Sequence, residues 1–185
     1  MTFEQPDIGT KYTRVEYERR FLVDTDSGWE NLVEPYSKLF EDKYISGTRL
    51  RLRVLTDSDT GRRLIKLTKK SDSRSPYFRT ISRILLSPDE HQILDLLDGH
   101  RLKKVRYYRN YLDRVFSVDV FEGDLAGLIL CETESDDLED LMSIQPLPIA
   151  RQEVTEDSFF DGGNLCRVSR QDLMAKLRGF RDIAR

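Results

Sequence analysis

Two segments of the chain carry acidic residues at a spacing that could bring carboxylates together. In TRVEYERRFLV, residues 13–23, the side chains of an extended strand alternate, so Glu16, Glu18 and Arg20 share one face. Glu132 and Glu134 repeat this separation in LCETES, residues 130–135. Carboxylates this close repel one another unless a cation, a proton or water screens them. The pattern predicts a charged site or surface rather than an ordinary half-buried strand.

Basic residues follow the same alternation on the strands between these segments. They group by strand face as Arg49, Arg51 and Arg53; Lys66, Thr68 and Lys70; and Lys104 with Arg106. Asp119 alternates with Val118 and Val120 on a later strand. Arg53 and Lys70 stand near strand ends, which predicts contacts at a rim. Cations therefore concentrate on the middle strands, and acid pairs on the first and a late strand.

Two interpretations fit this distribution. For any single strand, a charged face that points to solvent is the favoured interpretation. Taken together, however, the strands do not fit a randomly charged surface, which would mix positive and negative residues within each strand. In the alternative, a closed barrel turns these faces inward, where the cations repel one another unless an anion compensates them. A polyphosphate suits arginine and lysine, and paired carboxylates suit Mg²⁺ or Mn²⁺ bridging to phosphates. The charge pattern as a whole favours such a site.

Strand-like segments separated by turn-forming stretches must position these residues. They span residues 13–23, 38–45, 48–56, 62–70, 77–86, 101–112, 114–121 and 128–135. So many strands in one unit predict a mainly β fold, an antiparallel barrel or sandwich with a few flanking helices.

Helices are predicted over residues 87–97, with Ser87 as the N-cap, and over residues 169–184 at the C-terminus. Residues 1–11 predict a loose leader. The chain shows no internal repeat and no linker, so residues 1–185 are expected to form a single domain.

Composition limits the function classes. The net charge of −3 gives no global basic field, so a nucleic-acid partner is not expected. Cys131 and Cys166 form neither a zinc-site spacing nor a disulfide framework. No segment predicts a signal peptide or a membrane span, so a cytoplasmic protein with a small-molecule partner is expected. The oligomeric state is not determined by the sequence, with a homodimer as one alternative.

Several motifs, taken in order, resemble those of the CYTH superfamily, the triphosphate tunnel metalloenzymes. EYERR resembles the family signature E-x-E-x-K, and the strands that follow are similar in turn: RLRLR, LIK, KVRY, VDVFEGDLAGLILCETES and EVTEDSFFDGGNL. One such motif would be weak evidence, but the ordered set covers the chain from Glu16 to Leu165. The resemblance implies a tunnel of eight antiparallel strands that binds a triphosphate and requires Mg²⁺ or Mn²⁺.

The resemblance also implies roles for individual residues. Metal-facing carboxylates would be Glu16, Glu18, Glu132 and Glu134. Phosphate-binding residues would be Arg49, Arg51, Lys66, Arg79, Lys104 and Arg106. The residues placed with the catalytic machinery would be Arg20, Tyr44 and Asp119.

Two departures from the family pattern bear on function. Arg20 replaces the signature lysine, and arginine cannot give up a proton at working pH. Ile81 and Arg83 replace the two acids of the family's R-x-E-x-E strand. The leading hypothesis is metal-dependent hydrolysis of a triphosphate-bearing substrate, with inorganic triphosphate the first candidate. The alternatives are a non-catalytic polyphosphate or nucleotide binder, and an adenylyl cyclase that acts on ATP.

Overall fold

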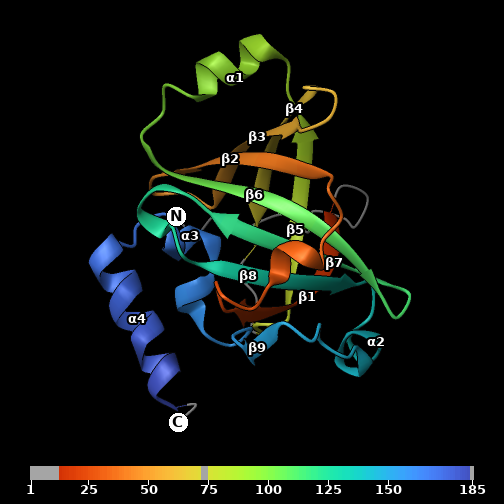
Figure 1. The fold of residues 1–185 in the computed structure, drawn as a ribbon. Coiled ribbons are helices and arrows are strands. Elements are labelled where there is room, and N and C mark those ends of the chain that lie inside the picture. Colours follow the sequence, from red (N-terminus) through yellow and green to blue (C-terminus); the bar gives the residue numbers. More distant parts are fainter. Residues whose placement is uncertain (1–12, 72–74, 184–185) are drawn as a thin grey trace.

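The protein, described by a computed structural model over residues 13–71 and 75–183, is built around a closed antiparallel barrel (Figure 1). Eight strands run around it in the order β5-β4-β3-β2-β6-β7-β8-β1, and β1 closes the ring by pairing with β5. Their bounds are β1 Thr13–Val23, β2 Ser37–Ile45, β3 Leu50–Asp57, β4 Arg63–Lys70, β5 Phe78–Leu85, β6 Gly99–Tyr111, β7 Arg114–Phe121 and β8 Ile129–Ser135. The predicted barrel is confirmed, and the sandwich is excluded.

A ninth strand, β9 (Ala150–Glu153), lies outside this ring and was not predicted. The first half of β1 pairs with β5 on one edge, and the end of β1 pairs with β9 on that same side of the strand. The other edge of β1 pairs with β8, in a register that sets Glu18 opposite Glu134 and Arg20 opposite Glu132. The two acid-bearing segments of the sequence are therefore neighbours in the barrel wall.

The helices lie around the barrel. Helix α1 (Pro88–Leu94) has the predicted Ser87 cap, which forms a reciprocal capping box with Glu90. Helix α4 (Arg170–Ile183) confirms the predicted C-terminal helix. The short helices α2 (Leu138–Ser143) and α3 (Gly162–Leu165) and the 3-10 turns η2 (Trp29–Asn31), η3 (Gly123–Leu125) and η4 (Ser158–Phe160) were not predicted. No described helix has both the length and the apolar character needed to cross a membrane. The predicted leader, residues 1–11, lies outside the described residues.

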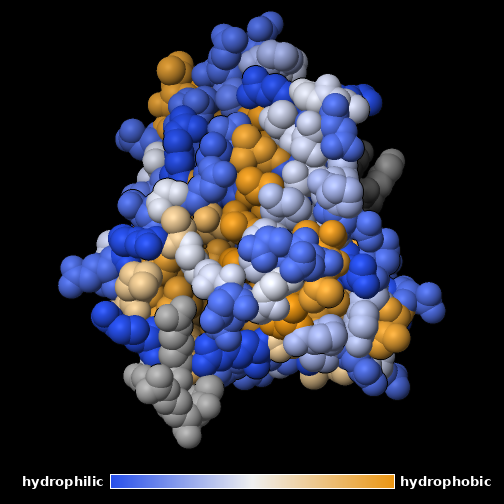
Figure 2. Space-filling view, in the orientation of Figure 1, coloured by the Kyte–Doolittle hydropathy of each residue, from blue (hydrophilic) through white to orange (hydrophobic). Residues whose placement is uncertain are grey.

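Apolar side chains pack against the outside of the barrel wall and at one end of it. Phe116 and Val118 of β7 are fully buried in a cluster that includes Leu141 of α2. A second cluster joins Leu130 of β8 to Leu173 of α4. In Figure 2 a band of apolar side chains crosses the middle of the face in view, between hydrophilic groups. With apolar residues covering the wall from outside, the charged face of each strand is left to the interior.

The same second cluster makes one end of the barrel interior apolar. Leu102, Phe121 and Leu130 belong to it, and they come from the end of the barrel where β6 and β8 start and β7 finishes. Phe160 of η4 and Leu165 of α3 complete the cluster and also line the interior cavity. Apolar side chains therefore line part of the interior at the end where β6 and β8 start.

Candidate functional site

A cavity of about 320 Å³ occupies the barrel interior and is lined by side chains from all eight strands. Its charged and hydroxyl-bearing lining consists of Arg14, Glu16, Glu18, Arg20, Lys38, Asp42, Tyr44, Arg51, Arg53, Lys66, Lys70, Arg83, Lys104, Arg106, Tyr108, Glu132 and Glu134. The strand alternation accounts for this lining, because inward and outward positions alternate along every strand of a barrel. The charged faces therefore look into one shared channel.

The sequence-predicted site residues fall into three positions. Ten of them line this channel: Glu16, Glu18, Arg20, Tyr44, Arg51, Lys66, Lys104, Arg106, Glu132 and Glu134. Asp119 is fully buried and contacts the channel-lining Lys104 and Arg106. Arg49 and Arg79 instead line a second cavity of about 400 Å³, which opens beside α3 and shares Arg20 and Arg51 with the channel.

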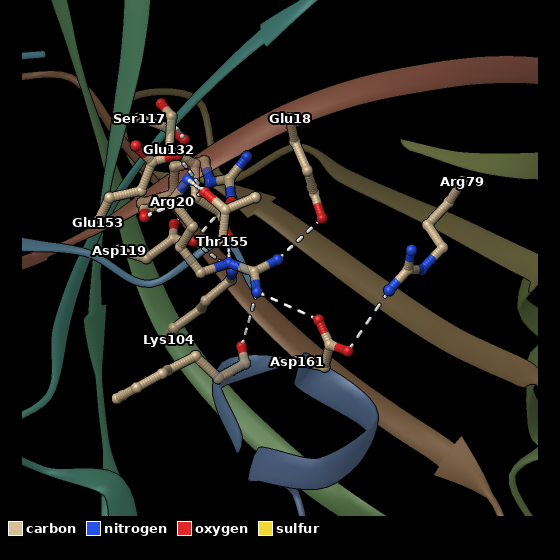
Figure 3. A network of polar contacts seen from close by, with 12 residues as sticks. Glu18, Arg20, Arg79, Lys104, Ser117, Asp119, Glu132, Glu153, Thr155 and Asp161 are labelled. Atoms are coloured by element: carbon tan, nitrogen blue, oxygen red, sulfur yellow. Dashed lines mark hydrogen bonds and ion pairs between the residues drawn. The ribbon is translucent and has the colours of Figure 1, made fainter. Parts of the chain in front are cut away.

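In one part of the channel wall, every charged side chain has a partner of opposite charge. We call this part the paired network; it consists of Arg20, Lys104, Arg106, Asp119 and Glu132. The Arg106 Nε lies 2.6 Å from Asp119 Oδ1, and its Nη2 lies 2.5 Å from Glu132 Oε2. Lys104 donates to the other oxygen of Asp119. Arg20 Nε lies 2.9 Å from Glu132 Oε1. All four oxygens of the two buried carboxylates are thus engaged (Figure 3).

The electrostatics of the paired network favour its charged form. Burial alone would raise the pKa of Glu132, but Lys104, Arg106 and Arg20 hold that pKa well below its usual range. Burial likewise lowers the pKa of Lys104, while Asp119 acts in the opposite direction. Charges removed from water are stable only when paired and hydrogen-bonded, and here they are. The donors Lys104 and Arg106 are therefore held in fixed positions before any ligand arrives.

The opposite side of the channel is a cationic wall formed by Arg51 and Arg53 of β3 and Lys66 and Lys70 of β4. One buried carboxylate, Asp42, serves both arginines: the Arg53 Nε lies 2.5 Å from it, and the Arg51 Nη1 lies 3.9 Å from it. Within residues 13–71 and 75–183, no carboxylate oxygen lies within 4.0 Å of either lysine ammonium. Burial is the main cause that lowers the pKa of Lys66 and of Lys70, and neighbouring arginines lower it further, whereas Glu18 acts in the opposite direction on Lys70. Among the described residues, these four cations have one carboxylate in direct contact, that of Asp42.

Among the residues that the structure describes, two buried polar groups of the cationic side have no hydrogen-bond partner. They are the Arg51 Nε and the Thr68 hydroxyl, and these residues face one another in the β3–β4 register. Buried polar groups are nearly always hydrogen-bonded in native proteins, to protein, water or a ligand. Of the two residues, Arg51 lines the channel, so a bound anion there could supply an acceptor for its guanidinium group.

The carboxylates predicted to hold a metal do not form a ready centre in this structure. Glu18 and Glu132 contact Arg20, and Glu16 lies 3.0 Å from Arg83. No group of three or more metal-binding side chains converges within the described part of the chain. Only Glu134 of these four makes no hydrogen bond or ion pair within that part. Removal from bulk water raises its pKa, and Glu16 adds to the rise. The arrangement does not fit a preformed Mg²⁺ or Mn²⁺ site.

Several site residues escaped the sequence reasoning. Asp42 could have been found, because it shares a strand face with Tyr44 of the same segment. Asp161 could not, since it lies in a loop 141 residues from its partner Arg20. Thr155 was also missed: it lies in the loop after the unpredicted β9, and its hydroxyl accepts a hydrogen bond from the Arg20 backbone N–H at 2.9 Å.

No sequence pattern pointed to Gly162, yet a Cβ there would lie 2.0 Å from the Tyr44 hydroxyl oxygen. Only glycine lets α3 approach Tyr44 this closely.

Comparison with known proteins relates this barrel to solved structures. No protein-family model matches the sequence, and no curated protein matches it. The structure is similar to that of the inorganic triphosphatase NE1496, with a TM-score of 0.53 and 24% identity over 83% of this chain and 95% of that one. Another NE1496 structure gives 0.54 and 25% over 83% and 99%. A proposed adenylate cyclase from Bacillus halodurans gives 0.52 and 13% over 79% and 98%.

Proposed function

We propose that this chain is a divergent member of the CYTH superfamily, and that it binds a triphosphate-bearing substrate in the channel and hydrolyses it. Inorganic triphosphate is the first substrate to test. The ordered motifs of the sequence and the similarity to an inorganic triphosphatase both support this proposal.

The observation that carries the proposal is the excess of positive charge on the cationic wall. Lys66 and Lys70 are held near Arg51 and Arg53, and among the described residues a single carboxylate, Asp42, is in direct contact with these four cations. Like charges gathered in a confined site repel one another strongly, so an anion from outside stabilises them. A triphosphate brings several charged oxygens into one linear group, which suits a wall built of lysine and arginine.

The paired network supplies the second requirement of phosphoryl transfer. This reaction depends on positioning and on neutralising charge more than on covalent chemistry. Arg106 and Lys104 are fixed by Asp119, so their remaining donor capacity faces the channel without reorganisation when charge develops on the phosphates. The triphosphate would therefore lie between the cationic wall and the paired network. A requirement for Mg²⁺ or Mn²⁺ remains a prediction.

The test is phosphate release from inorganic triphosphate, measured with Mg²⁺, with Mn²⁺ and with chelator. We expect turnover by the wild type and a loss of about ten-fold or more in kcat/KM for Lys66→Met, because a cation that contacts the phosphates is removed. Lys69→Met is the matched control, since Lys69 is exposed and lies outside the channel lining. No phosphate release by the wild type under any of these conditions would exclude hydrolysis of this substrate.

A non-catalytic binder is the second candidate, and one observation favours it: Glu16, Glu18 and Glu132 are all occupied by arginines. A binder would show a rise in melting temperature with triphosphate, polyphosphate or ATP, by mass action, with no product formed. Product analysis with labelled ATP in the same experiment separates the adenylyl cyclase alternative from both.

A further inference from the structure

The Arg20 guanidinium lies between Glu18 and Glu132, two of the four acidic side chains that the sequence predicted to bind a metal (Figure 3). Its Nη2 lies 2.8 Å from Glu18 Oε1, and its Nε lies 2.9 Å from Glu132 Oε1. Its third nitrogen, Nη1, lies 3.1 Å from the Phe160 carbonyl oxygen and 3.2 Å from Asp161 Oδ1. Each guanidinium nitrogen therefore has an oxygen acceptor.

The position of Arg20 is fixed from several sides. Its backbone N–H donates to the Thr155 hydroxyl, and the Thr155 hydroxyl in turn donates to Glu153. Arg20 as a whole is only 6% exposed. Such a side chain cannot swing aside without leaving buried carboxylates uncompensated, which is strongly unfavourable.

Arg20 supplies the positive charge that a hard metal cation could otherwise supply between these carboxylates. Glu18 and Glu132 repel one another across a short distance in the barrel wall, and each is mostly buried. A divalent ion would screen this repulsion, but its ligands must be free carboxylate oxygens. The Arg20 and Arg106 guanidinium groups together occupy both oxygens of Glu132.

We propose that Arg20 is a resident cation that takes the place of a metal ion between Glu18 and Glu132. The two carboxylates are thereby structural partners of an arginine and are not metal ligands in this protein. Arginine suits this role better than lysine, because its planar fork contacts several carboxylates at once. The flanking acids raise the pKa of Arg20 above its already high value despite burial, so the group stays charged at every working pH.

The test is direct Mn²⁺ binding by the protein without substrate, followed by electron paramagnetic resonance and calorimetry. We expect Arg20→Ala to gain a Mn²⁺ site, seen as affinity at least about ten-fold above that of the wild type. Adding Glu18→Gln and Glu132→Gln to this variant should abolish the gain. Arg19→Ala is the matched control: Arg19 is the next residue of β1, pairs with Glu153 and is absent from the channel lining, so its loss should create no site.

A second arm keeps the inference falsifiable if Arg20→Ala does not fold. In an otherwise wild-type chain, Glu18→Gln should leave Mn²⁺ binding unchanged, because Arg20 already occupies that carboxylate. A ten-fold loss of Mn²⁺ affinity in Glu18→Gln, or a folded Arg20→Ala that gains no site, would overturn the inference. Because no triphosphate is present, the result does not depend on whether the protein hydrolyses one.

Discussion

The two sides of the channel differ in how their charge is balanced. In the paired network, all four carboxylate oxygens of Asp119 and Glu132 accept hydrogen bonds from Arg20, Lys104 and Arg106. In the cationic wall, Arg51 and Arg53 share the single buried carboxylate of Asp42, and the two lysines have no carboxylate in direct contact among the described residues. Paired buried charges hold the folded barrel together, whereas unpaired ones weaken it until a ligand binds. The comparison indicates that the charges of one side depend on one another within the fold, whereas the excess positive charge of the other side is what the proposed triphosphate would neutralise.

The largest expected effect is on the paired side. Asp119→Asn keeps the shape of the side chain but leaves Lys104 and Arg106 without their carboxylate. We expect the free energy of unfolding to fall by about 3–5 kcal/mol, the usual cost of breaking a buried pair by removing one partner. Urea-induced unfolding of wild type and variant measures this difference.

The matched control for this prediction is an ion pair of the same type on the outside of the barrel. Lys103 and Glu122 lie 3.0 Å apart, and both side chains are about half exposed. Exposed pairs contribute little because water and salt screen them, so Glu122→Gln should unfold at the wild-type urea concentration. Equal losses in the two variants would mean that burial does not distinguish the two pairs.

Asp42, the carboxylate that contacts both arginines of the cationic wall, should make the free energy of unfolding depend on pH. Burial alone would raise the pKa of Asp42, but Arg53 and Arg51 lower it from 3.8 to about 2. A folded-state pKa below the ordinary value gives stability that is present above about pH 4 and is lost as the pH falls toward 2. This pKa shift corresponds to a contribution of about 2 kcal/mol to the free energy of unfolding.

Comparison of the wild type with Asp42→Asn isolates this contribution. The difference between their free energies of unfolding should be constant at pH 5 and above and should shrink between about pH 4 and pH 2, because the protonated wild type comes to resemble the variant. A difference that stays the same throughout would show that Asp42 is not the group that titrates.

The smallest expected effect is on ligand affinity at the cationic wall. Lys70→Met removes a partly buried ammonium that has no carboxylate in direct contact among the described residues, so triphosphate affinity should fall about ten-fold, while the melting temperature of the ligand-free protein should stay equal or rise. Calorimetric titration and thermal unfolding give the two values. A variant that loses stability without losing affinity would place Lys70 among the structural charges and would remove it from the ligand-binding wall.

Strand alternation in the sequence by itself determined the lining of the channel. The strands β2 to β8 begin and end within two residues of their predicted bounds. Inward and outward positions follow from a period of two, which is a local property of any strand. For that reason the spacing of Glu18, Arg51, Lys104 and Glu132 is enough to assign them to one charged surface, and all four line the channel.

The tertiary structure alone decided which charges meet. Arg20 lies opposite Glu132 because β1 pairs with β8, and it contacts Asp161 because the loop after β9 folds over the end of the barrel. Arg49 and Arg79 share the alternation of the channel residues, yet they line the second cavity beside α3. A local period specifies which way a side chain points, but loop paths and strand pairing across the chain determine its neighbours. Through those neighbours, three of the four carboxylates predicted to face a metal, Glu16, Glu18 and Glu132, contact arginines in the structure.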